Sequence, residues 1–248
     1  MRPAFLRETG HRPWPLPPGN WIMGQTWSDL LFAHWTADPE TLRPHLPAGL
    51  ELDLFEGEAW VGVVPFRMED VRLRGLPPVP GTATFPELNV RTYVRHGDRP
   101  GVWFFSLDAS NLLAVRVARA WFRLPYFDAR MSIEPEGDGV RYRSRRTHRG
   151  AAPAGFDASY RPTGPEKPTA PGTLEHFLTE RYCLYADGGR RGLRRGEIHH
   201  RAWPLQPAEA EIRTETQARA AGIALHDRAP LLHFARRIEV AAWSPVPA

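Results

Sequence analysis

Residues 85–130 read FPELNVRTYVRHGDRPGVWFFSLDASNLLAVRVARAWFRLPYFDAR, and this pattern predicts a β-hairpin, a helix and a further strand. Residues 87–94 alternate strictly between apolar and polar side chains, which is the two-residue period of a half-buried strand. Residues 102–108 carry bulky aromatic side chains that favour a second strand. Gly97 and Pro100 lie between them. The segment therefore predicts a hairpin with one core face and one polar face.

The two strands of this hairpin match on both faces when Arg91 lies opposite Phe104. A shift of one residue would turn charged side chains toward the aromatic core, so the pattern itself selects the register. In this register Glu87 lies opposite Asp108, with Cβ atoms about 5 Å apart. The sequence thus predicts two carboxylates in contact on the polar face.

The predicted pair of Glu87 and Asp108 has a chemical consequence. Two carboxylates this close raise the pKa of one of them, and a carboxyl group protonated near neutral pH can act as a general acid or base. Asn89 and Ser106 face each other on the same polar face. A second interpretation stays open: the face is solvated and its acids pair with Arg91 or with arginines elsewhere, since structural ion networks also perturb pKa values.

Residues 110–124 predict a helix next to the hairpin. Ser110 and Asn111 can cap its start, and it should end before Pro125. Its apolar positions recur at helical spacing, at Leu113, Val117, Trp121 and Leu124. Three arginines form a separate stripe, at Arg116, Arg119 and Arg123. We interpret this stripe as a solvated face, with binding of a phosphate or an acidic partner as the alternative.

Length and composition indicate a globular protein. The 248 residues, 42% of them hydrophobic, are enough to bury a large core. We expect one domain over residues 20–248 and, before it, a proline-rich arm over residues 1–19 that lies on the body or on a partner subunit. The single cysteine, Cys183, excludes an internal disulfide and fits a reducing compartment. The N-terminus lacks the apolar segment of a signal peptide, and no stretch has the length of a membrane span, so we expect a cytoplasmic protein.

The basic charge comes almost entirely from arginine. The net charge is +4, and Lys167 is the one lysine among 32 basic residues. Arginines cluster in residues 141–149 and 190–195, but neither cluster matches a nucleic-acid-binding signature, so nucleic-acid binding is kept only as a weaker alternative. His199 and His200 are neighbours on a predicted strand, where successive side chains point to opposite faces and cannot share one metal ion. We expect no metal and no cofactor.

Strand patterns dominate the remaining sequence. We expect strands over residues 21–35, 126–134, 140–147, 156–160, 208–215 and 231–243, and a hairpin that joins residues 50–54 to 60–68. Short helices are expected after Asp38, after Thr173 and near residues 216–222. Nine tryptophans and 26 prolines suggest a cavity rimmed by rigid loops and aromatic side chains, with aromatic core packing as the alternative.

Two segments resemble acetoacetate decarboxylases. AHWTADPETLRPHLPAGLEL, residues 33–52, resembles their early segment, which commonly reads Tyr-Arg-Thr-Asp-Pro and continues with a Leu-Arg pair. ARAWFRLPYFDARM, residues 118–131, resembles their catalytic segment, in which Gly-Phe-Pro or Gly-Leu-Pro precedes two lysines. Residues 27–205 are more similar still to an uncharacterised bacterial family of the same superfamily, domain of unknown function 2071 (DUF2071). The motifs that carry this resemblance are LPAGLELDLFEGEAWVGVVPFRM, FPELNVRTYV, GVWFFSLDASN and FLTERYCLYA.

The resemblance implies a mainly β (α+β) fold, in which antiparallel curved sheets surround a closed, cone-like cavity and a few helices lie outside. It also implies a Schiff base between the first lysine of the pair and a ketone. Here Tyr126 and Phe127 occupy the two lysine positions, and a phenol cannot form an imine. Lys167 lies in a proline-rich loop, and Thr36 replaces the arginine of the early motif. We therefore exclude Schiff-base decarboxylation, although Glu87 falls where the resemblance places an acidic pocket residue.

These features predict a small-molecule pocket for a compact organic acid or carbonyl compound. The expected catalytic residues are Glu87, Asp108 and Tyr126, and the expected substrate-binding residues are Arg91, Asn89, Thr36 and Ser106. One of the two carboxyl groups would move a proton, Arg91 would hold a carboxylate or enolate, and Tyr126 would donate a hydrogen bond to the carbonyl oxygen. A non-catalytic ligand-binding or sensor domain is the alternative, and a structural or interaction protein is a weaker one. Because the related decarboxylases form large oligomers, a homo-oligomer is compatible with the resemblance.

Overall fold

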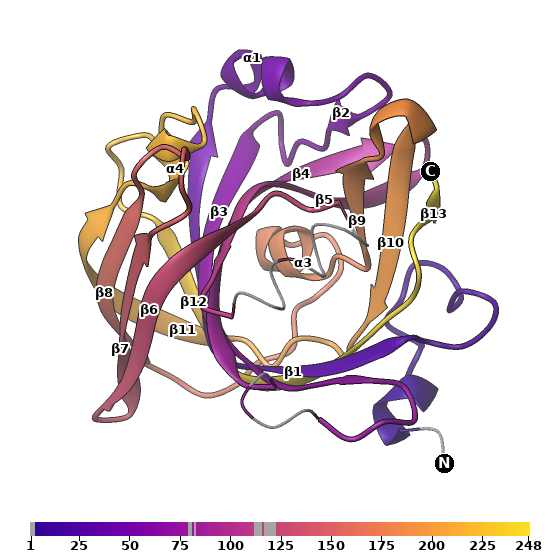
Figure 1. The fold of residues 1–248 in the computed structure, drawn as a ribbon, viewed down its shortest axis with the longest axis horizontal. Coiled ribbons are helices and arrows are strands. Elements are labelled where there is room, and N and C mark those ends of the chain that lie inside the picture. Colours follow the sequence, from indigo (N-terminus) through magenta and orange to yellow (C-terminus); the bar gives the residue numbers. More distant parts are fainter. Residues whose placement is uncertain (1–2, 79–80, 82, 112–115, 117–122) are drawn as a thin grey trace.

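The computed structural model describes residues 3–78, 81, 83–111, 116 and 123–248, and strands dominate it (Figure 1). The strands are β1 (Met23–Ala37), β2 (Glu51–Leu52), β3 (Ala59–Leu73), β4 (Phe85–His96), β5 (Arg99–Ala109), β6 (Tyr126–Glu136), β7 (Gly139–Arg146), β8 (Gly155–Pro162), β9 (Cys183–Asp187), β10 (Leu193–His199), β11 (Gln206–Glu215), β12 (Leu231–Ala242) and β13 (Val246–Pro247). The helices are α1 (Pro39–Leu42), α3 (Leu174–Thr179) and α4 (Gln217–Ala220), with 3-10 turns η1 (Ala4–Arg7), η2 (Arg43–His45) and η3 (Gly189–Arg191). The predicted mainly β fold with few helices is confirmed. The helix predicted over residues 110–124 lies largely outside the described residues.

One large sheet curls back on itself. Its strands follow the order β13-β10-β9-β5-β6-β7-β8-β11-β12-β1-β3-β4-β2, and further pairings join β4 to β5 and β10 to β12. Most neighbours are antiparallel, whereas β5 pairs in parallel with both β6 and β9. The strands surround α3 in Figure 1. Among the described residues, no helix has the length and apolar character needed to cross a membrane.

Two large hydrophobic clusters hold the curved sheet together. Leu31 and Leu88 belong to one cluster, and Phe32, Phe66 and Leu107 belong to the other. Leu31 and Phe32 are consecutive yet belong to different clusters, because successive side chains of a strand point to opposite faces. The second cluster lies on the face that lines the cavity described below.

The proline-rich N-terminal residues pack on the body of the protein. Phe5 and Leu6 are buried in a cluster with Trp243. Arg12 reaches β10, where its Nη2 lies 3.5 Å from the Glu197 carboxylate. An apolar contact and an ion pair therefore fix this segment to the strands.

The central hairpin has the predicted register only near its turn. Arg91 pairs with Phe104, as predicted, but Val90 then pairs with Ser106. The extra residue, Phe105, makes a β-bulge in β5. A bulge inserts one residue into one strand, and this reverses the face to which the following side chains point.

The bulge makes the predicted contact between Glu87 and Asp108 wrong. Glu87 pairs with Ala109, and the residue opposite Asp108 is Leu88, on the other face of the sheet. The predicted pairing of Asn89 with Ser106 is wrong for the same reason, since Asn89 pairs with Leu107. A second correction concerns β2, which pairs with β4 and not in a hairpin with β3.

Candidate functional site

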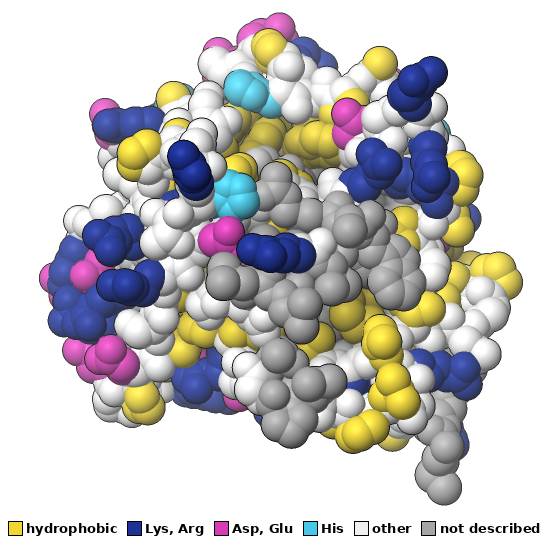
Figure 2. Space-filling view, viewed as in Figure 1, with side chains coloured by type: hydrophobic (Ala, Val, Ile, Leu, Met, Phe, Trp, Pro, Cys, Tyr) yellow, Lys and Arg dark blue, Asp and Glu magenta, His cyan; other side chains and the backbone are white. Residues whose placement is uncertain are grey.

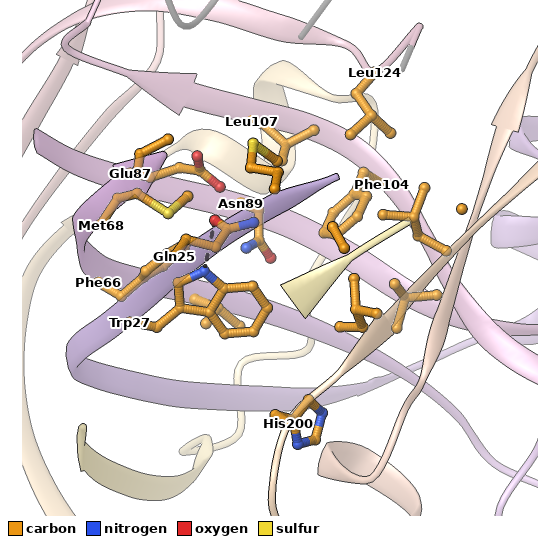
Figure 3. A pocket seen from close by; sticks show the side chains of 18 of the residues that line it. Gln25, Trp27, Phe66, Met68, Glu87, Asn89, Phe104, Leu107, Leu124 and His200 are labelled. Atoms are coloured by element: carbon orange, nitrogen blue, oxygen red, sulfur yellow. Dashed lines mark hydrogen bonds between the residues drawn. The ribbon is translucent and has the colours of Figure 1, made fainter. Parts of the chain in front are cut away.

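The inner face of the sheet borders a cavity of about 420 Å³, which is within the size range of small-molecule pockets. Its walls come from β1, β3, β4, β5, β6, β9 and β10 and from the segment between β3 and β4. Most lining side chains are apolar. Figure 3 shows Trp27 and Phe66 on one side of the cavity and Phe104, Leu107 and Leu124 on another.

A row of polar side chains crosses this apolar wall along β4. Glu87, Asn89 and Arg91 all line the cavity, because alternate residues of a strand point to the same face. Gln25 and Tyr126 line it from β1 and β6. Figure 3 shows Gln25, Glu87 and Asn89 directed into the same part of the cavity. A ligand there would meet an acid, two amides and a guanidinium within apolar surroundings.

Glu87 is a buried carboxyl group, and no cation of the described residues pairs with it. Its residue is 3% exposed, and the Tyr126 hydroxyl donates a hydrogen bond of 3.0 Å to Glu87 Oε2. Burial raises the pKa of Glu87 to about 8, against the opposing effect of the Tyr126 hydrogen bond. No arginine, lysine or histidine of the described residues forms an ion pair with it. At neutral pH Glu87 is therefore mostly protonated and uncharged.

Two tyrosines position Glu87 from opposite faces of the sheet. Tyr126 begins β6 and pairs with Leu107 of β5, and burial and the Glu87 carboxyl group raise the pKa of its hydroxyl well above the usual value. Tyr126 is consequently a neutral hydrogen-bond donor. On the other face, the Tyr142 hydroxyl donates a hydrogen bond of 2.7 Å to the Glu87 carbonyl oxygen. One tyrosine thus orients the side chain and the other fixes the backbone.

The amides beside Glu87 differ in their hydrogen bonding. Gln25 Oε1 accepts a hydrogen bond of 3.0 Å from Trp27 Nε1. Asn89 is 4% exposed, and its Oδ1 has no hydrogen-bond partner among the described residues. An unsatisfied buried acceptor costs free energy, so a ligand or water that donates to Asn89 would stabilise this part of the cavity.

Arg91 lies at one end of the polar row, four residues beyond Glu87 along β4. Its Nη2 donates long hydrogen bonds to the Leu178 carbonyl oxygen, at 3.4 Å, and to the Tyr93 hydroxyl, at 3.5 Å. The guanidinium lies 5.3 Å from the ring centroid of Phe32. Among the described residues, no carboxylate forms an ion pair with Arg91, and its Nε has no partner. This cation therefore has its charge available to an anionic ligand.

Two buried side chains, Tyr93 and His34, form a hydrogen-bonded pair next to Arg91. The Tyr93 hydroxyl donates to the Leu178 carbonyl oxygen at 2.8 Å, and His34 Nε2 lies 2.6 Å from the same hydroxyl. Burial, and secondarily the charge of Arg91, hold the pKa of His34 well below its usual value. His34 is therefore neutral. Sequence reasoning missed this pair, because nothing in the alternation of β1 indicates which partner His34 meets.

Asp108, predicted to be catalytic, lies outside the cavity lining. Its side chain is fully buried beside Arg146, whose Nη2 lies 2.6 Å from Asp108 Oδ1, and Gln217 Nε2 donates to Oδ2 at 3.1 Å. Burial raises the pKa of Asp108, and the hydrogen bonds from Arg146 and Gln217 oppose this shift. Ser106 and Thr36 are also absent from the lining. The structure brings Glu87, Asn89, Arg91 and Tyr126 together and leaves these three residues elsewhere.

The structure also shows where the lysine, the candidate metal ligands and the clustered arginines lie. Lys167 is exposed and does not line the cavity. No group of three or more His, Cys, Asp or Glu residues in the described part of the chain is arranged to hold a metal ion. In the arginine-rich segments, Arg141 pairs with Asp157 at 3.3 Å and Arg195 with Glu197 at 3.4 Å.

Comparison with known proteins agrees with the resemblance stated from the sequence. The profile of DUF2071, described as an uncharacterized conserved protein, matches residues 24–239. The chain is 47% identical over 228 residues to the Uncharacterized protein YqjF of Bacillus subtilis (strain 168). The aligned region covers 92% of this chain and 93% of that relative.

Solved structures share the fold at low sequence identity. An acetoacetate decarboxylase from Legionella pneumophila superimposes with a TM-score of 0.62 at 15% identity, covering 100% of this chain and 96% of its own. The enduracididine biosynthesis enzyme MppR, in complex with the condensation product of pyruvate and imidazole 4-carboxaldehyde, gives a TM-score of 0.62 at 12% identity. This superposition covers 93% of the present chain and 90% of the MppR chain. At such identities these likenesses establish the fold alone.

Proposed function

The chain belongs to the DUF2071 family, and we propose that it binds a small organic acid or carbonyl compound in its cavity and moves a proton with Glu87. The observation that carries this proposal is the buried Glu87 carboxyl group, which faces the cavity, accepts a hydrogen bond from Tyr126 and has a pKa near 8. A pKa close to the working pH is what general acid–base catalysis requires.

The proton transfer follows from the two protonation states of Glu87. In its ionised form, the carboxylate accepts a proton from the carbon beside a ligand carbonyl, and the two electrons of that C–H bond become the enolate. In its protonated form, the carboxylic acid returns the proton to carbon or to oxygen. Tyr126 keeps the carboxyl group directed at the cavity. The negative charge passes from Glu87 to the ligand and back, and no lysine takes part.

Arg91 would hold the acidic end of the ligand. It is a cavity cation without a carboxylate partner among the described residues, and guanidinium pairs well with carboxylate. The solved structure of MppR with a pyruvate-derived compound is further support, because it concerns a protein of this fold that accommodates a carbonyl-derived ligand.

A panel of oxo acids and carboxylic acids tests the proposal. Binding is measured by thermal shift, and each hit is tested for exchange of its α-proton with deuterium by NMR. We expect exchange in the unmodified protein and at least a hundredfold loss in Glu87→Gln, whereas Glu40→Gln on the surface should behave like the unmodified protein. Exchange at an unchanged rate in Glu87→Gln would refute the role of Glu87.

A second candidate function is ligand binding without turnover. It is favoured by the position of Lys167, the single lysine, which is exposed and outside the cavity lining. The same panel separates the two functions. Saturable binding with no proton exchange in the unmodified protein would support a binding or sensor domain and exclude the enzyme.

A further inference from the structure

We propose that the ligand is an amphipathic carboxylate, whose charged end lies at Arg91 and whose aliphatic tail leaves the cavity over Leu73 and Leu76. This inference rests on the proposed binding function and names its ligand class. It follows from the order of side chains along β3 and β4, from the exposure of the last of them and from the absence, among the described residues, of a carboxylate paired with Arg91.

The polarity of the cavity changes in one direction along β4. In order from Arg91 toward the end of β4 that pairs with Met68, the lining residues are Arg91, Asn89, Glu87 and Phe85: a cation, an amide, an uncharged acid and a phenyl ring. Arg91 and Phe85 are six residues apart, which corresponds to about 20 Å along a strand. A compact acid bound at Arg91 would leave the outer part of this path empty.

The neighbouring strand continues the apolar path to the surface. Phe66 pairs with Glu87, and Met68 pairs with Phe85. Beyond them, Val71, Arg72 and Leu73 of β3 also line the cavity, and Arg72 Nη1 donates a hydrogen bond of 3.1 Å to the Asp70 carbonyl oxygen. The step from residue 68 to residue 71 breaks the two-residue alternation, and it coincides with an irregularity in the pairing of β3 with β1. At this irregularity Val71 and Leu73 continue the apolar lining to the end of the strand, on either side of Arg72.

The path ends on exposed apolar side chains. Leu73 and Leu76 are 46% and 58% exposed, and both line the cavity together with Pro77. Figure 2 shows hydrophobic side chains gathered at the lower right, where Figure 1 places the segment that follows β3. Exposed apolar patches mark contact sites for proteins, membranes or ligands, and the continuity of this one with the cavity lining favours a ligand. A ligand tail is therefore the occupant that this surface fits.

The test measures affinity against chain length. Straight-chain carboxylates from butanoate to dodecanoate, kept below their micelle concentrations, are titrated while tryptophan fluorescence is followed, because Trp27 and Trp203 both line the cavity. Each methylene group that enters the apolar path should tighten binding about fourfold. Decanol, which lacks the charge, should bind at least tenfold more weakly than decanoate.

Matched variants locate the tail and the charged end. Leu76→Asp should weaken dodecanoate at least tenfold and leave butanoate unchanged. Leu54→Asp, which alters an exposed leucine outside the cavity lining, should change neither. Arg91→Gln should remove the preference for decanoate over decanol.

The outcomes separate this inference from the proposed function. Binding of short acids with no gain from chain length would overturn the inference and leave the proposed function standing. If no straight-chain carboxylate of any length binds, the inference fails, and the proposed function fails with it only if the panel of oxo acids also gives no binding. If Leu76→Asp instead converts an oligomer into a monomer in light scattering and chain length has no effect, the exposed leucines belong to a subunit interface and the inference is wrong.

Discussion

Glu87 and Asp108 lie on adjacent strands and are almost completely buried, with exposures of 3% and 0%, yet their surroundings differ in charge. Asp108 meets the guanidinium of Arg146 and the amide of Gln217. Glu87 meets one phenol hydroxyl and a cavity. One carboxyl group is neutralised by a cation, and the other is neutralised by its own proton.

This difference separates a structural acid from a reactive one. Burying a carboxylate is costly unless a cation and hydrogen bonds compensate it, and the Arg146 group provides both for Asp108. Burial raises the pKa of both acids, but no cation of the described residues compensates Glu87. Its pKa rises to about 8, so its proton can be exchanged near neutral pH. The bulge at Phe105 creates the difference, because it turns Asp108 away from the face on which Glu87 lies.

The largest expected effect is that of Asp108→Asn. The substitution leaves the guanidinium of Arg146 buried without a carboxylate, and breaking a buried ion pair in this way costs roughly 3–5 kcal/mol in the free energy of unfolding. Urea denaturation monitored by tryptophan fluorescence measures the loss.

A surface pair provides the control for Asp108→Asn. Glu40 lies 3.0 Å from Arg43, and both side chains are exposed. Glu40→Gln should change the free energy of unfolding by no more than about 0.5 kcal/mol, because exposed ion pairs contribute little. A similarly small loss in Asp108→Asn would mean that the buried pair has no structural importance, and the contrast with Glu87 would disappear.

Glu87→Gln should have the opposite sign and stabilise the protein. Between pH 4.5 and 8 the unfolded chain releases the Glu87 proton while the folded chain retains it, so stability falls as the pH rises through this range. The effect amounts to roughly 3 kcal/mol at pH 7. A glutamine cannot ionise, and it removes this loss.

The measurement for Glu87→Gln is a series of urea denaturation curves between pH 4 and 9. The free energies of unfolding of the variant and the unmodified protein should agree near pH 4 and diverge progressively up to about pH 8. Parallel pH profiles would show that Glu87 is ionised in the folded protein, and that Glu87 and Asp108 are two acids of the same kind.

The sequence predicted the elements of this comparison but not their arrangement. The strict alternation of residues 87–94 located β4, and it placed Glu87, Asn89 and Arg91 on one face. The bulge at Phe105 has no signature in the sequence, because an aromatic residue suits either face of a strand. Every pairing deduced beyond that residue was therefore shifted, including that of Asp108.

Contacts between distant segments were likewise beyond prediction. Arg146 and Gln217, which bind Asp108, are 38 and 109 residues away from it in the chain. Tyr126 was identified from the decarboxylase resemblance, but its hydrogen bond to Glu87 depends on the parallel pairing of β5 with β6. Periodicity assigns a face to a residue, whereas partners are set by how the sheet curls.

The smallest expected effect, that of Tyr126→Phe, tests the single hydrogen bond that distinguishes the surroundings of Glu87. Losing it should cost about 1 kcal/mol. Tyr142→Phe is the matched control, because it removes a hydrogen bond to the Glu87 backbone on the other face of the sheet. The two variants should lose similar stability but differ in pH dependence. The Tyr126 hydrogen bond lowers the pKa of Glu87, so only Tyr126→Phe should extend the fall in stability to a higher pH. An equal shift in both variants would mean that the phenol holds Glu87 in place without tuning its proton affinity.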